Sequence, residues 1–344
     1  MLSVELLRRL PKPELHLHVP GSVRPGTLRT FLEEDGLPAA LAGSYGRAAD
    51  GEGLTRYLAR FSAWNAIAWT PERLARVVTE LRADLAADGI VDAERRLRPP
   101  SEDPGNWDAL MEAAIAAAQA GGGGPSLRFI DYVNRRWPAE RAEAEARRAT
   151  RWAGRGVVGF DISGDESLYG LAHLVPAVCL AREAGLWITV HAGEGAGPAA
   201  GPASIRVALD QFAPARIAHG VRSVEDPALL DELGERGIHL ELALTSNMQT
   251  AAVPDLARHP FAVLLRRGLS VSLNTDCRTV SGTTLAEEFA LAANVLGLSL
   301  AELARAAEHA AAAAFLSAEQ RRSLVTRFRS GWASLLERSE AGPP

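Results

Sequence analysis

Two histidines alternate with apolar residues near the start of the chain, in the segment Glu-Leu-His-Leu-His-Val at 14–19. On a β-strand successive side chains point to opposite faces, so His16 and His18 would share one face while their apolar neighbours enter a core. Imidazoles at this spacing suit Zn²⁺, which favours nitrogen ligands. The alternative is a pair of polar residues on a half-exposed strand, and the spacing alone leaves both open.

Three later apolar runs end in residues that could complete a hydrolytic metal site. His191 and Glu194 follow one run, His219 closes the next, and Asp276 follows the last. The carboxyl ends of parallel barrel strands meet on one face, where barrel enzymes carry their chemistry. The N-terminal histidine pair, His191 and Asp276 could therefore converge on one metal and leave a position open for water.

Short β-branched runs alternate with alanine-rich amphipathic segments along most of the chain. This alternation predicts parallel strands with right-handed helical crossovers, and eight strands favour a closed (β/α)₈ TIM barrel over an open sheet. Besides the opening strand, the expected strands are 89–97, 127–134, 157–163, 186–192, 216–220, 238–244 and 269–275. The expected helices between them are 109–120, 141–152, 171–184, 202–212, 228–236 and 260–267.

One barrel domain is expected over residues 1–344, because α/β barrels reach this length without a second core. Apolar spacing with a helical period predicts extra helices in an insertion at about 25–90, after the first strand, and again from Leu300 onward. Within the insertion, Thr70 is expected as a helix N-cap with Pro71 in the first turn.

The composition excludes several classes of function. A net charge of −5 and the lack of a basic run argue against nucleic-acid binding. The chain shows no membrane-spanning run and only two, widely separated cysteines, so a cytoplasmic location is expected. No GxxxxGK[ST] or GxGxxG motif follows a strand, which removes the usual support for nucleotide-triphosphate or dinucleotide binding.

Five blocks of sequence, taken in order, resemble the adenosine deaminase family, the adenosine/AMP deaminase branch of the amidohydrolase barrels. They are Pro-Glu-Leu-His-Leu-His at 13–18, His-Ala-Gly-Glu at 191–194, Ala-His-Gly-Val at 218–221, Thr-Ser-Asn at 245–247 and Ser-Leu-Asn-Thr-Asp at 272–276. The resemblance implies a TIM barrel with a helical substrate lid in the 25–90 insertion. It also implies hydrolytic deamination of adenosine or deoxyadenosine to inosine or deoxyinosine plus ammonia.

The resemblance assigns a role to each reactive side chain. One Zn²⁺ per chain would be held by His16, His18, His191 and Asp276. The metal would lower the pKa of bound water to about 7. His219 and Asp276 would take up the proton of that water and orient the hydroxide.

The resemblance also implies the substrate contacts. Glu194 would donate a proton to purine N1, so that C6 becomes electrophilic. The backbone N–H of Gly164 would bind purine N3, since a residue without Cβ lets a ring come close to the backbone. His18 and Cys277 complete the expected set of substrate-binding residues.

Two positions depart from the family pattern, and both concern substrate recognition. Pro20 stands where the family usually has an aspartate that binds the ribose 5′-hydroxyl, and proline offers no side-chain acceptor. Cys277 stands where a second carboxylate usually contacts purine N7, and a thiol bonds more weakly. A 5′-modified adenosine, adenine or another aminated heterocycle therefore stays open beside adenosine as the substrate.

Two alternative functions of other classes are disfavoured by the sequence. A non-catalytic barrel that binds a nucleoside or a partner is disfavoured by the complete set of reactive groups. A two-metal hydrolase bridged by a modified lysine is disfavoured because Lys12, the only lysine, precedes the expected first strand. The expected partner is a small-molecule substrate, without nucleic acid or membrane, and the oligomeric state is left open.

Overall fold

The centre of the molecule is a parallel sheet of eight strands, arranged in chain order. The computed structural model describes residues 1–120, 123–197 and 199–340. The strands are β1 Lys12–His18, β2 Ile90–Arg96, β3 Ser126–Asn134, β4 Val157–Ser163, β5 Trp187–Ala192, β6 Arg216–His219, β7 His239–Leu242 and β8 Val271–Leu273. The expected TIM barrel is confirmed.

The barrel closes where the chain beyond β8 meets β1. The backbone N–H of His18 donates to the carbonyl of Asp276 at 2.7 Å, and the N–H of Asp276 donates to the carbonyl of His16 at 3.0 Å. Residues far apart in sequence therefore share one seam of the barrel, between β1 and the segment after β8.

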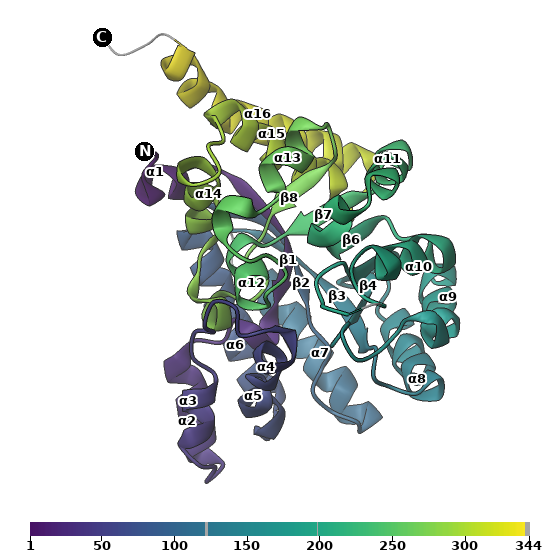
Figure 1. Cartoon of the computed structure of the whole chain (residues 1–344). Coiled ribbons are helices and arrows are strands. Elements are labelled where there is room, and N and C mark those ends of the chain that lie inside the picture. The colour runs from purple at the N-terminus through teal and green to yellow at the C-terminus, as the bar shows by residue number, and fades with distance from the viewer. Residues whose placement is uncertain (121–122, 198, 341–344) are drawn as a thin grey trace.

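Helices surround the barrel and extend it at both ends. The helices associated with the crossovers are α6 Pro71–Ala87, α7 Pro104–Gln119, α8 Ala139–Thr150, α9 Val175–Glu183, α10 Pro202–Phe212, α11 Pro227–Glu235 and α13 Phe261–Arg266. The N-terminal helix and the insertion comprise α1 Val4–Arg8, α2 Pro25–Glu34, α3 Ala40–Ser44, α4 Leu54–Ala59 and α5 Ser62–Ala66. The C-terminal helices are α14 Leu285–Asn294, α15 Leu300–Ala313 and α16 Ala318–Glu340. Figure 1 shows α2 to α5 at one end of the molecule and α16 at the other.

The expected start of α6 is confirmed, because the Thr70 side chain accepts the backbone N–H of Arg73 and Pro71 lies in the first turn. Among the described helices, none combines the length and the apolarity that crossing a bilayer requires.

Two local predictions were wrong. The seventh strand was expected to reach residue 244, but β7 ends at Leu242 and a helix, α12 Leu244–Gln249, follows. The carboxylate of Glu288 on α14 accepts the first N–H groups of α12, from Leu244 at 2.7 Å and from Thr245 at 3.3 Å. A cap supplied from a distant segment fixes where this helix begins, and local sequence does not reveal it.

Lys12 lies on the barrel and not before it, since it is the first residue of β1. Its ammonium donates to the carbonyls of Leu7 at 2.6 Å and Leu10 at 2.8 Å, at the amino end of the strand. The strand thus separates the lysine from His18 at its other end.

Asp131 on β3 is a fully buried carboxyl group with few partners. Its Oδ1 accepts the backbone N–H of Tyr132 at 2.8 Å, and its Oδ2 has no hydrogen-bond partner among the described residues. Burial, followed by the charge of nearby Glu145, raises the pKa of Asp131 well above its usual range. The native state therefore retains a proton that the unfolded chain releases.

We predict that Asp131→Asn stabilises the protein in a pH-dependent manner. Below the unfolded pKa both states are protonated, and the wild type carries no penalty; above it, wild-type stability falls as pH rises towards the native pKa. The gain in free energy of unfolding should be small at about pH 4 and exceed about 1 kcal/mol at about pH 7. Urea unfolding of both proteins at the two pH values measures this gain, and an equal gain at both would contradict the assignment.

Candidate functional site

Four side chains expected as metal ligands converge at the carboxyl end of the barrel. His16 and His18 lie on β1, His191 lies on β5, and Asp276 follows β8. The Nε2 atom of His18 is 3.3 Å from that of His16 and 3.1 Å from that of His191. Oδ1 of Asp276 lies 3.5 Å from Nε2 of both His16 and His18. Ligand atoms about 2 Å from one tetrahedral ion lie about 3.3 Å apart, so these spacings fit a metal.

The protonation of His18 and His191 also fits a metal, whereas for His16 the contacts with the carboxylates of Asp276 and Glu241 outweigh burial and raise the pKa. Burial lowers the pKa of both His18 and His191, which favours neutral rings. Nδ1 of His191 faces Oδ2 of Asp161 at 2.9 Å, and Nδ1 of His16 faces Oε2 of Glu241 at 3.2 Å. A neutral ring that donates from Nδ1 keeps its lone pair on Nε2, which points at the shared centre.

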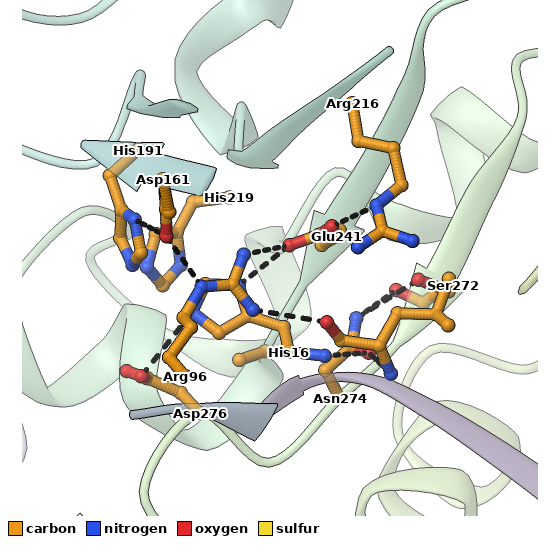
Figure 2. A network of polar contacts seen from close by, with 12 residues as sticks. His16, Arg96, Asp161, His191, Arg216, His219, Glu241, Ser272, Asn274 and Asp276 are labelled. Atoms are coloured by element: carbon orange, nitrogen blue, oxygen red, sulfur yellow. Dashed lines mark hydrogen bonds and ion pairs between the residues drawn. The ribbon is translucent and has the colours of Figure 1, made fainter. Parts of the chain in front are cut away.

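A single guanidinium joins the two carboxylates that hold these rings. Arg96 on β2 donates from Nε to Asp161 and from Nη2 to Glu241, each at 2.6 Å. Its Nη1 donates to the carbonyl of Leu15 on β1 at 3.0 Å. Figure 2 shows the guanidinium of Arg96 between Asp161 and Glu241. Through these two carboxylates, one buried side chain on β2 thus braces the expected ligands His16 and His191 on two other strands, a role that sequence spacing did not indicate.

Glu194 follows β5 on a loop that a second glutamate holds in place. The buried carboxylate of Glu166 accepts four backbone N–H groups, from Gly193 at 2.9 Å, Glu194 at 2.8 Å, Gly195 at 2.7 Å and Gly201 at 3.1 Å. Burial, followed by the charges of Asp276 and Glu166, raises the pKa of Glu194 well above its usual range. A protonated Glu194 can donate a hydrogen bond or a proton. Glu166 was given no role from the sequence, because its hydrogen-bond partners are backbone groups in the segment that follows β5.

His219 and Asp276, the latter an expected metal ligand, adopt strained backbone conformations beside the histidine cluster. Their φ angles are 65° and 59°, and only four described residues other than glycine have positive φ. Nε2 of His219 lies 3.4 Å from Oε2 of Glu194, and the Ser246 hydroxyl donates to Oδ2 of Asp276 at 2.6 Å. Such conformations persist where surrounding contacts enforce them, which is common at functional sites.

A cavity of about 420 Å³ opens onto these groups. The insertion contributes Tyr57, Phe61 and Trp64 to its wall, and the barrel contributes Pro20 and Cys277. Two of the expected substrate contacts, His18 and Gly164, also line it. The structure therefore brings all the sequence-predicted site residues except His16 to the wall of one cavity, and His16 lies behind it with its Nε2 3.3 Å from that of His18.

Gly164 and Cys277 each occupy a tightly constrained position. Gly164 has φ of 110°, and a Cβ there would lie 2.7 Å from Oδ1 of Asn134. The Cys277 thiol is buried, donates to Oδ1 of Asp276 at 3.4 Å, and abuts the position that a Cβ on Gly21 would fill. Burial and the Asp276 charge raise the pKa of this thiol well above its usual range, so it stays protonated.

Known proteins match almost the whole chain. The family model "Adenosine deaminase" matches residues 11–330. The adenosine deaminase of Mycobacteroides abscessus is 34% identical over 361 aligned residues, covering 97% of this chain and 99% of that protein. That of Serratia proteamaculans is 36% identical over 335, covering 93% and 98%. The solved structure of Arabidopsis ADAL complexed with IMP has a TM-score of 0.84 at 27% identity, covering 96% of this chain and 99% of that one. The sequence match and the shared barrel show that this chain belongs to the adenosine deaminase family of hydrolytic deaminases.

Proposed function

We propose that this protein hydrolyses the 6-amino group of a purine nucleoside, with adenosine and 2′-deoxyadenosine as the first candidates. The observation that carries the proposal is the placement of a buried Glu194 with raised pKa beside His219 and the histidine–aspartate cluster, in one cavity. A carboxyl group whose pKa is raised by burial keeps its proton more readily, and such a group can supply the proton that a ring nitrogen requires.

We propose one Zn²⁺ per chain, held by His16, His18, His191 and Asp276. When bound, the ion would supply water of lowered pKa, near 7, at the open coordination position. Nitrogen-rich sites of this kind also accept other divalent metals, so the identity of zinc belongs to the proposal.

The residues of the chain would divide the remaining work. Glu194 would protonate N1 of the ring, and the backbone N–H of Gly164 would hold N3. His219 and Asp276 would orient the attacking water, and its proton would pass to this pair. The water oxygen becomes the 6-oxo group, the amino group leaves as ammonia, and the water's two hydrogens end on ammonia and on Glu194.

The wall around Pro20 and Cys277 supports a second candidate, a 5′-modified adenosine. Pro20 has no side-chain acceptor, the thiol of Cys277 is already engaged by Asp276, and Phe61 from the insertion lies beside Gly21. An uncharged, partly apolar wall suits a substrate that lacks a free 5′-hydroxyl, or adenine itself. The contribution of α4 and α5 to the cavity supports a lid role for the 25–90 insertion within one domain.

A substrate panel tests the proposal. Zinc-loaded protein should convert at least one of adenosine, 2′-deoxyadenosine, 5′-deoxy- and 5′-thio-adenosines, adenine and AMP, with loss of the 6-aminopurine absorbance and release of ammonia. Glu194→Gln, which cannot deliver an acidic proton, should lower kcat by about 10²- to 10⁴-fold while retaining zinc. If the zinc-bound protein converts none of these compounds, the proposal is contradicted.

Pro20→Asp tests the interpretation of the 5′ end. The new carboxylate should raise kcat/KM for adenosine relative to 5′-deoxyadenosine by about tenfold, because a hydrogen bond to a charged acceptor becomes possible. An unchanged ratio in a folded, zinc-loaded variant would show that position 20 does not face the 5′-hydroxyl.

We predict that Arg96→Met weakens zinc binding about 10- to 100-fold, because both carboxylates that orient His16 and His191 lose their shared partner. Arg95→Met is the matched control. Arg95 is also fully buried on β2, but its guanidinium lies 4.4 Å from the ring of Phe129. Competition with a zinc chelator measures both affinities, with circular dichroism to confirm folding, and equal affinities would refute the bracing role.

A further inference from the structure

A chain of hydrogen bonds begins at a backbone amide outside the cavity. The N–H of Phe261 donates to Nδ1 of His259 at 3.2 Å. Because a backbone N–H only donates, Nδ1 of His259 must accept, and the proton of the neutral ring lies on Nε2. Burial lowers the pKa of His259 to about 3, so the ring is neutral at pH 7.

The protonated nitrogen of His259 sets the orientation of Asn247 on α12. Nε2 of His259 lies 3.2 Å from Oδ1 of Asn247, and the backbone N–H of Ala243 faces the same oxygen at 3.4 Å. Two donors on one side require the amide oxygen there, so the amino group must point the other way.

That amino group meets His219. Nδ2 of Asn247 lies 3.0 Å from Nδ1 of His219, and an amide nitrogen has only hydrogens to offer. The tautomer protonated at Nδ1 and the imidazolium both carry a proton on Nδ1 of His219. That proton would face the amide hydrogens of Asn247, so two donors would oppose each other. Its proton therefore belongs on Nε2, the atom that faces Glu194 at 3.4 Å.

We infer that His259 and Asn247 are positioning residues that hold His219 in the tautomer protonated at Nε2, so that His219 serves the site as a hydrogen-bond donor. The consequence for catalysis rests on the proposed function. His219 would hold the oxygen of the attacking water, and the O–H bond that breaks would give its proton to the Asp276 carboxylate, which later passes it to the leaving amino group. The family resemblance assigns the uptake of the water's proton to His219 and Asp276 jointly. The series of hydrogen bonds that runs from His259 through Asn247 to His219, which we call the relay, divides the work: His219 donates and Asp276 accepts.

Nuclear magnetic resonance of the zinc-loaded protein, labelled with ¹⁵N-histidine and free of substrate, tests the tautomer directly. Long-range ¹H–¹⁵N correlations should show His219 with an unprotonated Nδ1 and a protonated Nε2, and loss of these signals in His219→Gln assigns them. A protonated Nδ1 in the wild type would overturn the inference. Because no substrate is present, failure to deaminate purines would overturn the proposed function and leave this tautomer standing.

Asn247→Asp tests whether the relay causes the tautomer. A carboxylate at position 247 accepts from His219, so Nδ1 should become protonated, and kcat should fall about 100-fold with a smaller change in KM. His239, buried between the hydroxyls of Ser270 at 2.8 Å and Ser272 at 2.9 Å, lies outside the relay and should keep its signals.

Two further variants complete the test. His259→Gln keeps a donor towards Asn247 and should preserve the wild-type tautomer. If Asn247→Asp does not fold, His259→Phe removes the donor, frees the amide to turn over, and should abolish the single tautomer. Unchanged His219 signals in a folded Asn247→Asp protein, or in the folded His259→Phe replacement, would overturn the relay.

Discussion

The buried guanidinium of Arg96 is the contact on which the site depends. Its two carboxylate partners, Asp161 and Glu241, are fully buried, and Glu241 also forms an ion pair with Arg216, whose other carboxylate partner is Glu94. TIM barrels are usually filled by bulky aliphatic side chains. Here part of the interior is a network of buried ion pairs in which arginines and carboxylates alternate. Such a network is stable only while every charge keeps its partner. His16 and His191, which we propose as metal ligands, lie at one end of this network, so their orientation follows from the filling of the barrel.

The two ends of the cavity differ in the groups that line them and in the contacts that hold those groups. At the reacting end, carboxylates, a guanidinium and backbone amides fix each reactive side chain from at least one side. At the substrate end, Pro20, Cys277 and the aromatic residues of the insertion share the wall with charged side chains such as Arg98, Arg136 and Asp165, and Thr55 on α4 donates to Asp165 at 2.5 Å. Changes at Pro20 or in the insertion can therefore alter substrate choice with less effect on the reacting end than changes at Cys277, whose thiol donates to Asp276.

Much of the fold and of the site could be predicted from sequence because the signals are local. A strand period around His16 and His18, and reactive residues at the ends of apolar runs, are visible in a single chain. The roles of Arg96, Glu166, Glu288 and Asn247 were not visible in this way. Each acts on a residue of another element, and their partners are backbone groups or side chains whose proximity only the closed barrel creates.

The seam between β1 and the segment after β8 has a consequence for biosynthesis. Asp276, which bonds to β1 across the seam, lies about 260 residues after His16 and His18, so the ribosome adds the histidine pair long before this carboxylate. A nascent chain that ends before β8 has the histidine pair but no carboxylate opposite it and no closed barrel. The complete donor set can therefore assemble only after synthesis has passed β8, and the first seven strands alone cannot form it.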